Sequence, residues 1–265
     1  MSDDGGERIA KVMARAGMCS RRQAERWIGD GRVKVDGVVL STPAVTVTAS
    51  SIILVDDKPL PSPAETRLWR YHKPPGLLTS HGDPQGRATV FDRLPREIGR
   101  VISIGRLDLN SEGLLLLTND GELARQLELP ATAWQRRYRV RVYGVVNPDR
   151  LAALAKGITI DGIKYGAIDA ALESTAGRNS WLSVALSEGK NREIRKVLEH
   201  LKLEVNRLIR VSFGPFSLGQ MSRGQVMEIS GKILRDQVIA TGAGKSRGKG
   251  WARAKKKPVR KKSRS

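Results

Sequence analysis

The chain of 265 residues contains very few of the side chains that form disulfides or bind metal ions. Its one cysteine, Cys19, excludes a disulfide within the chain. Its three histidines, His72, His81 and His200, show no metal-ligand spacing with that cysteine. We therefore expect a metal-free protein that needs no cofactor and that functions in a reducing compartment.

Long apolar runs are also missing. No run approaches the roughly 20 residues that a membrane-spanning helix needs. The first residues, MSDDGGER, lack the apolar segment of a signal peptide. We therefore expect a soluble, cytoplasmic protein.

Acidic residues are scarce relative to basic ones, with 27 Asp and Glu against 47 Lys and Arg. The formal net charge is +20 and the pI is about 10.6. Residues 241–265 contain no acidic residue and supply +11 of this charge, which leaves +9 for residues 1–240. Such an excess predicts a polyanionic partner, most simply nucleic acid. The composition of the tail, residues 241–265, predicts disorder.

One stretch, residues 105–121, organises the rest of the chain; it reads GRLDLNSEGLLLLTNDG. Its four consecutive leucines, bounded by glycines, favour a buried strand over a helix. Two carboxylates, Asp108 and Glu112, precede these leucines and would lie at the mouth of the strand. We predict that Asp108 is the chemical centre; the alternative is that it only caps a turn.

The first 60 residues predict a small unit of two helices and a hairpin. Apolar positions at helical spacing indicate a helix over residues 7–16, and Ser20 followed by Gln23 indicates a capped helix through Ile28. Valines flank Asp36-Gly37, which is a strong hairpin signal. A further strand is expected over residues 52–55.

This unit resembles the RNA-binding module of ribosomal small-subunit protein four, through RIAKVMARAGMCSRRQAERWIGDGRVKVDGVVL. The resemblance implies a domain over residues 7–60 with RNA contacts from basic side chains, which are Arg21, Arg22, Arg26 and Lys34. Arginines at a helix start oppose the helix dipole and need another reason to be there. The alternative is an ordinary mini-domain with a solvated basic face.

A proline-rich linker over residues 61–66 precedes a second predicted domain over residues 67–240. Its patterns predict strands and helices in irregular order, and therefore an α+β sheet domain without βαβ repeats. The expected strands are 68–72, 101–104, 138–143, 158–161, 167–172, 181–186, 204–212 and 225–229. The expected helices are 90–94, 122–127, 148–156, 191–201 and 231–239.

Four motifs in this second domain occur in the same order in bacterial ribosomal RNA pseudouridine synthases. They are KPPG at 73–76, the central stretch at 105–121, RRYRVRV at 136–142 and EGKNREIRKVLEHL at 188–201. The chain resembles the RsuA/RluB-type family, most closely its RluB-type, large-subunit rRNA branch. The resemblance implies a mixed, mainly antiparallel sheet with flanking helices, and isomerisation of a uridine in ribosomal RNA by a monomer.

The same resemblance assigns roles to individual residues. Asp108 matches the family's catalytic aspartate, which attacks C1′ or removes a proton from C2′, and Arg195 matches the cation that pairs with it. Tyr138 matches the tyrosine that stacks on the target base, and Arg106 matches the arginine that fills the space of the flipped-out nucleotide. Ile194 would form the apolar wall of the base pocket. Lys73, in the KPPG motif, is expected to contact RNA or to shape a turn.

Several alternatives stay open at this stage. Glu112 as a second carboxylate would suit a glycosidase, but we interpret it as a surface charge. The expected substrate is 23S ribosomal RNA, with a pre-ribosomal large subunit as the expected partner, and 16S ribosomal RNA is the alternative. A non-catalytic rRNA-binding or ribosome assembly factor on the same fold is the competing class of function.

Overall fold

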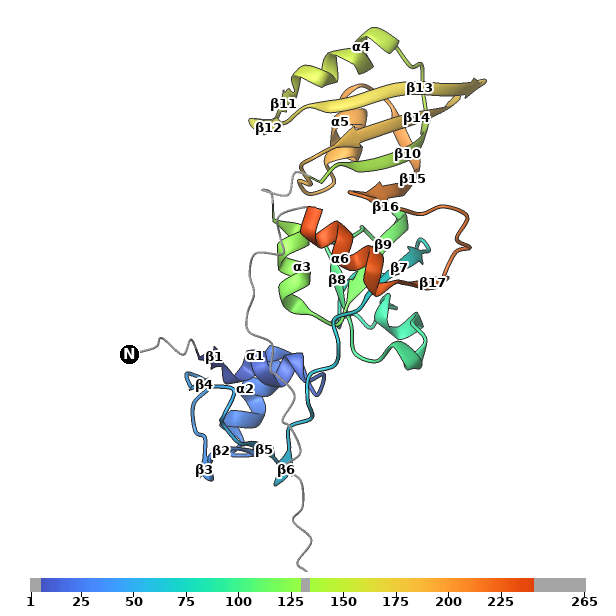
Figure 1. The fold of residues 1–265 in the computed structure, drawn as a ribbon. Helices are drawn as coiled ribbons and strands as arrows, with labels where there is room; N and C mark the ends of the chain where they lie inside the picture. The colour runs from blue at the N-terminus through green and yellow to red at the C-terminus, as the bar shows by residue number, and fades with distance from the viewer. Residues whose placement is uncertain (1–5, 130–133, 241–265) are drawn as a thin grey trace, which may run out of the picture.

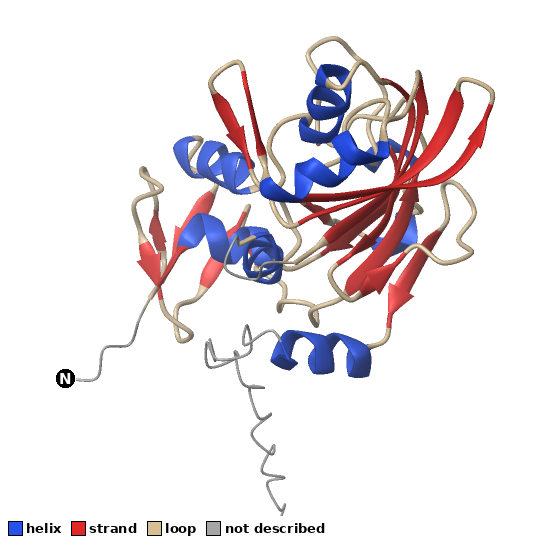
Figure 2. Cartoon of the chain, turned by 90° about the horizontal axis from the view of Figure 1, so that it is seen from above, coloured by secondary structure: helices blue, strands red, loops and turns tan. Residues whose placement is uncertain are grey.

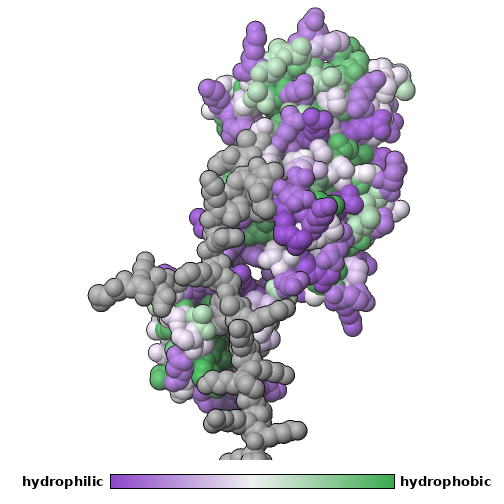
Figure 3. Space-filling model, viewed as in Figure 1, coloured by the Kyte–Doolittle hydropathy of each residue, from purple (hydrophilic) through white to green (hydrophobic). Residues whose placement is uncertain are grey.

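Two folded units follow one another along the chain, and Figure 1 shows the smaller, N-terminal unit below the larger one. The computed structural model describes residues 6–129 and 134–240. The predicted disordered tail and residues 1–5 of the lead lie outside the described residues. In the space-filling view the N-terminal unit forms a separate lobe (Figure 3).

The N-terminal unit pairs two helices with a small sheet, as predicted. Ser20 caps the second helix by accepting a hydrogen bond from the amide of Gln23. Asp36 and Gly37 turn the hairpin with φ values of 50° and 84°, which is the conformation that an Asp-Gly turn favours. The helices are α1 (Ile9–Arg15) and α2 (Arg21–Gly29). The sheet joins β3 (Val38–Val39), β2 (Val33–Val35), β5 (Ile53–Val55) and β6 (Lys58–Pro59), and β1 (Glu7–Arg8) pairs with β4 (Thr46–Val47).

This unit has a core of its own. Ile9, Met13 and Ile28 from the helices are fully buried against Val33 of the sheet. The polar faces of the helices therefore point outward, which leaves the arginines of α2 exposed. The chain then runs without regular structure over residues 60–67 into the larger unit.

A nine-stranded sheet forms the larger unit, and its pairings are antiparallel except for one. The exception joins β15 (Glu204–Phe213) to β9 (Glu112–Thr118) in parallel. The strand order is β13 (Ile168–Ala176), β14 (Asn179–Leu186), β10 (Arg136–Tyr143), β15, β9, β7 (Leu68–Lys73) and β17 (Val226–Ile229). In addition β8 (Ile102–Ile104) pairs with β9 and β16 (Phe216–Ser217) with β15.

The parallel pair divides this sheet into two halves, which lie one above the other in Figure 1 and cross the body of the unit in Figure 2. One half contains β10 and β13 to β15 and is covered by α4 (Pro148–Ala153) and α5 (Glu193–His200). The other contains β7 to β9 and β17 and packs against α3 (Gly121–Glu128) and α6 (Gly231–Ala240). Short 3-10 helices lie at Phe91–Arg93, Arg96–Ile98 and Leu154–Lys156.

The leucine run forms β9, as predicted, and is buried on both faces. Leu114 and Leu116 pack toward α3 and α6, whereas Leu115 and Leu117 pack into a second core on the opposite face. A strand covered on both sides reads as a continuous apolar run instead of an alternating one. The central stretch is therefore the most deeply buried strand of its half.

The sequence patterns missed several short strands, which are β1, β4, β12 (Ile163–Tyr165) and β16. The strand predicted over residues 158–161 is β11 (Ile158–Ile160), and it forms a hairpin with β12. Two or three residues carry too little periodicity to be detected. The helix predicted over residues 148–156 ends as α-helix at Ala153 and continues as a 3-10 turn. Among the described residues, no helix is both long enough and apolar enough to cross a bilayer.

Candidate active site

Asp108 lies in the turn between β8 and β9, at the junction of the two halves of the sheet. Its carbonyl accepts a hydrogen bond of 3.0 Å from the amide of Ser111, which closes the turn just before the strand begins. Its side chain is 26% exposed, so the carboxylate is partly sheltered and still reachable. The turn is thus attached directly to a strand that is buried along its whole length.

Gly113 allows the two halves to meet at this point. It adopts a φ of +104° and lies opposite Arg210 in the parallel pairing. A Cβ atom at this position would lie 2.3 Å from the Arg210 carbonyl oxygen and 2.7 Å from its amide nitrogen. Only glycine permits this backbone approach. The position of Asp108 relative to the other half of the sheet therefore depends on Gly113.

The side chain of Lys73 is buried and anchors the turn that holds Asp108. Its ammonium donates to the carbonyls of Pro74 (3.0 Å), Leu109 (3.3 Å) and Ser111 (2.8 Å), and the residue is fully buried. Burial lowers the pKa of Lys73 to about 8, although the negative charge of Asp108 opposes that shift. The prediction of an RNA contact by Lys73 is therefore corrected, because its three donors are used inside the protein. The alternative prediction, a turn residue, fits the geometry.

The cation closest to the Asp108 carboxylate is Arg192, whose Nη1 lies 3.6 Å from Oδ2. The sequence prediction had chosen Arg195, three residues further along. Arg195 instead donates to the carbonyls of Val205 (3.0 Å) and Asn110 (3.2 Å), and so connects α5 to β15 and to the Asp108 turn. Burial lowers the pKa of Arg195, whereas the charge of Asp108 opposes the shift. Both arginines thus act on Asp108, Arg192 by the ion pair and Arg195 through the turn.

A carboxyl pair fixes the loop that presents Arg192. Glu193 is buried and accepts a hydrogen bond of 2.9 Å from the amide of Lys190, and Glu188 accepts from the amide of Gly166. Burial raises the pKa of Glu193 to about 7, and the negative charge of Glu188 adds to the shift. Arg192, between Lys190 and Glu193, has a left-handed φ of 53°. The contact between Lys190 and Glu193 therefore fixes the loop on both sides of Arg192, the residue that reaches Asp108.

Tyr138 lies on β10, beside the same junction of the two halves of the sheet. It is half-buried and packs against the cores of both halves of the sheet. Arg210 lies opposite Tyr138 on the neighbouring strand, and its buried guanidinium donates from Nε to the carbonyl of Leu114. Burial lowers the pKa of Arg210, and Tyr138 partly opposes that shift. The phenol is thereby held between two cores, with Arg210 opposite it on the neighbouring strand.

Glu112 is not a surface charge, so that interpretation of the sequence was wrong. Its side chain is 4% exposed; Arg207 Nε donates to one carboxylate oxygen, and Arg223 Nε lies 2.9 Å from the other. Burial alone would raise the pKa of Glu112, but the two arginines hold it below its ordinary value. This carboxylate ties β9 to β15, so it is not free to serve as a second acid or base.

Two further predicted site residues are Arg106, within the turn that holds Asp108, and Ile194, on α5. Arg106 is exposed and, within residues 6–129 and 134–240, makes no hydrogen bond or ion pair. The intervening Leu107 is buried, so Arg106 and Asp108 flank an anchored residue. Ile194 is 6% exposed and belongs to the same core cluster against which Tyr138 packs.

The predicted RNA-binding residues of the N-terminal unit differ in how free they are. Arg21, Arg22 and Arg26 are exposed on α2. Lys34 is half-buried, and its ammonium lies 2.5 Å from a carboxylate oxygen of Asp57. The three arginines are therefore available for an anionic partner, while Lys34 would first exchange its present partner.

The site has one partly sheltered carboxylate, a cation beside it, a second cation behind its turn and an aromatic residue from the opposite half of the sheet. A carboxylate kept ionised in such surroundings can act as a nucleophile or as a general base. Asp108 and Tyr138, both predicted from the sequence, lie at this junction, whereas Arg192 was not predicted. The spacing of Arg192 and Arg195 in NREIR gave the only signal, since either arginine could have faced Asp108.

Comparison with known proteins gives two family matches. The model of the RNA pseudouridylate synthase family matches residues 67–200, and the S4 domain model matches residues 7–53. The chain is 49% identical over 235 residues to an uncharacterized RNA pseudouridine synthase of Rickettsia prowazekii (strain Madrid E), covering 88% of this chain and 98% of that protein. It is 42% identical over 219 residues to ribosomal large subunit pseudouridine synthase B of Yersinia pestis, covering 80% and 69%. A crystal structure of a pseudouridylate synthase superposes with a TM-score of 0.60 at 25% identity, covering 86% of this chain and 98% of that one.

Proposed function

Because the chain belongs to the RNA pseudouridylate synthase family, we propose that it converts one uridine of 23S ribosomal RNA to pseudouridine with Asp108 as the catalytic residue. The observation that carries the role of Asp108 is its placement: a partly exposed carboxylate beside Arg192, on a turn fixed to a buried strand. Support for the large-subunit target comes from the 42% identity to a ribosomal large subunit pseudouridine synthase.

The reaction needs an ionised carboxylate next to the ribose. The bond between N1 and C1′ breaks, the base rotates, C5 bonds to C1′, and the proton of C5 is lost while N1 gains one. Asp108 can promote this either by attacking C1′, which gives a covalent sugar–enzyme bond, or by removing the C2′ proton. Both routes start from the ionised carboxylate and regenerate it at the end, and Arg192 stabilises that ionised form.

Three further residues are proposed to handle the base. A uridine stacked in a helix is out of reach, so the nucleotide must leave the stack, and Arg106, exposed beside the turn, would occupy its space. Tyr138 would stack on the flipped base and help to remove the C5 proton, which suits its position between the two halves of the sheet. Ile194 would contribute the apolar wall behind it.

The N-terminal unit is proposed to bring the enzyme to its RNA. It matches the S4 domain, and its α2 presents three exposed arginines to a phosphate backbone. We propose that the protein acts as a monomer in the cytoplasm, where ribosomal RNA is its partner. A pre-ribosomal large subunit would expose the target uridine before the RNA is fully folded.

Carbodiimide mapping of pseudouridine in ribosomal RNA from cells with and without the gene tests this function. We expect one pseudouridine of 23S ribosomal RNA to become uridine when the gene is deleted. Loss of a position in 16S ribosomal RNA instead would contradict the proposed target. An unchanged map would contradict the proposed reaction and favour a binding or assembly factor.

The two arginines near Asp108 are expected to respond differently to substitution. Arg192→Gln removes the ion pair of an exposed side chain, so the single-turnover rate should fall about tenfold with the free energy of unfolding unchanged. Arg195→Gln removes two hydrogen bonds to carbonyls, so the rate should fall and the free energy of unfolding should drop by about 2 kcal/mol. Urea unfolding and rapid-quench isomerisation assays measure both quantities. Equal stability losses in the two variants would contradict the assignment of Arg192 to the ion pair.

A further inference from the structure

A cavity lies between the N-terminal unit and the larger unit, away from Asp108. Its volume is about 480 Å³. The walls come from α1 and the start of α2 on one side, and from α3 and the segment around residues 100–103 on the other. Neither unit forms this cavity alone, so it exists only when the two units are docked.

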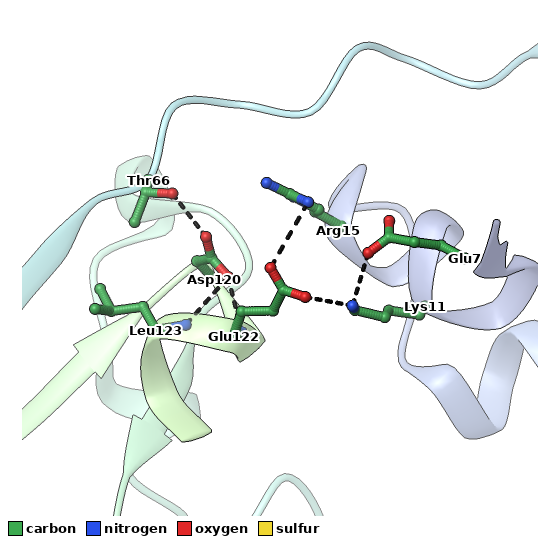
Figure 4. Close-up of polar contacts among 7 residues, drawn as sticks. All are labelled: Glu7, Lys11, Arg15, Thr66, Asp120, Glu122 and Leu123. Atoms are coloured by element: carbon green, nitrogen blue, oxygen red, sulfur yellow. Dashed lines mark hydrogen bonds and ion pairs between the residues drawn. The ribbon is translucent and has the colours of Figure 1, made fainter. Parts of the chain in front are cut away.

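An ion-pair cluster across the boundary holds the units in this arrangement (Figure 4). The Lys11 ammonium contacts Glu122 of α3 and lies 2.7 Å from Glu7, and Arg15 Nη1 lies 4.0 Å from the other Glu122 oxygen. The pairs are partly exposed, and such pairs are weak and sensitive to salt. They fix how the two walls of the cavity face each other.

The carboxylates of the cavity wall are already engaged by the protein. Asp120 caps α3 through the amides of Glu122 and Leu123, and its other oxygen accepts from Thr66. Glu122 is neutralised by the ion-pair cluster. Glu128 accepts a hydrogen bond of 2.5 Å from the amide of Gly105. None of these carboxylates is therefore left facing the cavity without a partner.

Three arginines of the cavity wall differ from these carboxylates in that their side chains have no partner among the described residues. Arg21 comes from the start of α2, Arg100 from the residue before Val101, and Arg125 from α3, and all three are exposed. Among the described parts of the chain, the side chains of all three lack a hydrogen bond and an ion pair. Burial raises the pKa of the Cys19 thiol in the N-terminal unit, and the charge of Arg100 opposes that shift. Three unpartnered guanidinium groups thus converge on one hollow from both units.

We propose that this cavity binds the phosphodiester backbone of the substrate RNA, with Arg21, Arg100 and Arg125 as its phosphate contacts. Guanidinium groups bind phosphate through paired, charge-assisted hydrogen bonds, and an excess of free cations attracts a polyanion. The inference rests on the proposed function in one respect, namely that the ligand is RNA. It adds a site to which both units contribute, and it assigns Arg100 and Arg125 of the larger unit to RNA binding.

The variant Arg100→Ala/Arg125→Ala tests the proposal, because both side chains are exposed and lie outside the ion-pair cluster. Its matched control is Arg150→Ala/Lys156→Ala, which removes the same charge on and after α4, at the far end of the larger unit in Figure 1. Fluorescence anisotropy with transcribed 23S ribosomal RNA fragments and with a 20-base-pair RNA duplex gives affinity at several salt concentrations.

We expect the cavity variant to bind about tenfold more weakly than the control at 0.15 M salt. The slope of log K against log[salt] should also become shallower by about 1.5 to 2, as for two lost phosphate contacts. Affinity and slope equal to those of the control would overturn the proposal. The binding assay does not require turnover. An unchanged pseudouridine map would contradict the proposed function, but it would not change the outcome of the binding assay.

Discussion

Replacing Asp108 by asparagine is expected to abolish isomerisation while RNA binding survives. The amide has nearly the same size and keeps a hydrogen-bond acceptor, but it is neither a nucleophile nor a base. We therefore expect the single-turnover rate to fall by at least about 10³-fold. Release of tritium from C5-labelled uridine in transcribed 23S ribosomal RNA measures the rate, because the C5 hydrogen is lost in the reaction.

The matched control is Asp161→Asn. Asp161 lies in the exposed turn between β11 and β12 with a φ of 49°, a conformation that asparagine tolerates. This variant should retain full activity, and both variants should bind RNA as the unaltered protein does. Activity in Asp108→Asn within tenfold of the control would remove Asp108 from its proposed role. Loss of RNA binding would show that the carboxylate serves the fold of the turn.

The second large effect is expected at Gly113, where the two halves of the sheet meet. Gly113→Ala should lower the free energy of unfolding by about 3–5 kcal/mol, since the new methyl group overlaps the Arg210 backbone and the positive φ is strained. Moving β9 from β15 also moves the Asp108 turn away from α5, so the surviving folded fraction should be nearly inactive. Urea unfolding followed by fluorescence measures the stability.

Gly86→Ala separates the two causes. Gly86 also has a positive φ, 68°, but a Cβ atom there would have no neighbour within 4 Å. This variant should lose only the conformational cost of about 1 kcal/mol and keep its activity. If Gly113→Ala is no less stable than Gly86→Ala, the close approach of the two strands does not hold the site together.

Local sequence signals were sufficient for the elements that surround the site. The leucine run predicted β9 because a strand buried on both faces needs apolar residues at every position. Asp36-Gly37 and the Ser20 cap predicted the N-terminal unit because turns and helix ends depend on a few adjacent residues. The α+β architecture followed from the irregular order of these elements.

The contacts of the site required the tertiary structure. Arg192 and Arg195 have the same charge and lie three residues apart, and the sequence does not indicate that Arg192, at the left-handed start of α5, is the one that reaches Asp108. Lys73 was predicted to contact RNA or to shape a turn, and Glu112 was interpreted as a surface charge, because charged residues are seldom buried. Apart from Pro74, their partners come from residues distant in the sequence, so no local pattern indicated the burial.

These contacts suggest how the fold serves the chemistry. The carboxylate comes from one half of the sheet, while Arg192 and Tyr138 come from the other. The backbone approach at Gly113 and the ion pairs of Glu112 fix the halves relative to each other. A polar cluster that is assembled across such a junction is preorganised, and little reorganisation is then needed in the transition state.

The most direct test returns the chain to cells that lack its gene. Pseudouridines in 23S and 16S ribosomal RNA are mapped by carbodiimide modification after complementation with the unaltered chain or with Asp108→Asn at equal protein levels. The account predicts that one 23S pseudouridine lost on deletion reappears with the unaltered chain and stays absent with Asp108→Asn. Restoration of that position by Asp108→Asn would contradict the central role given to Asp108.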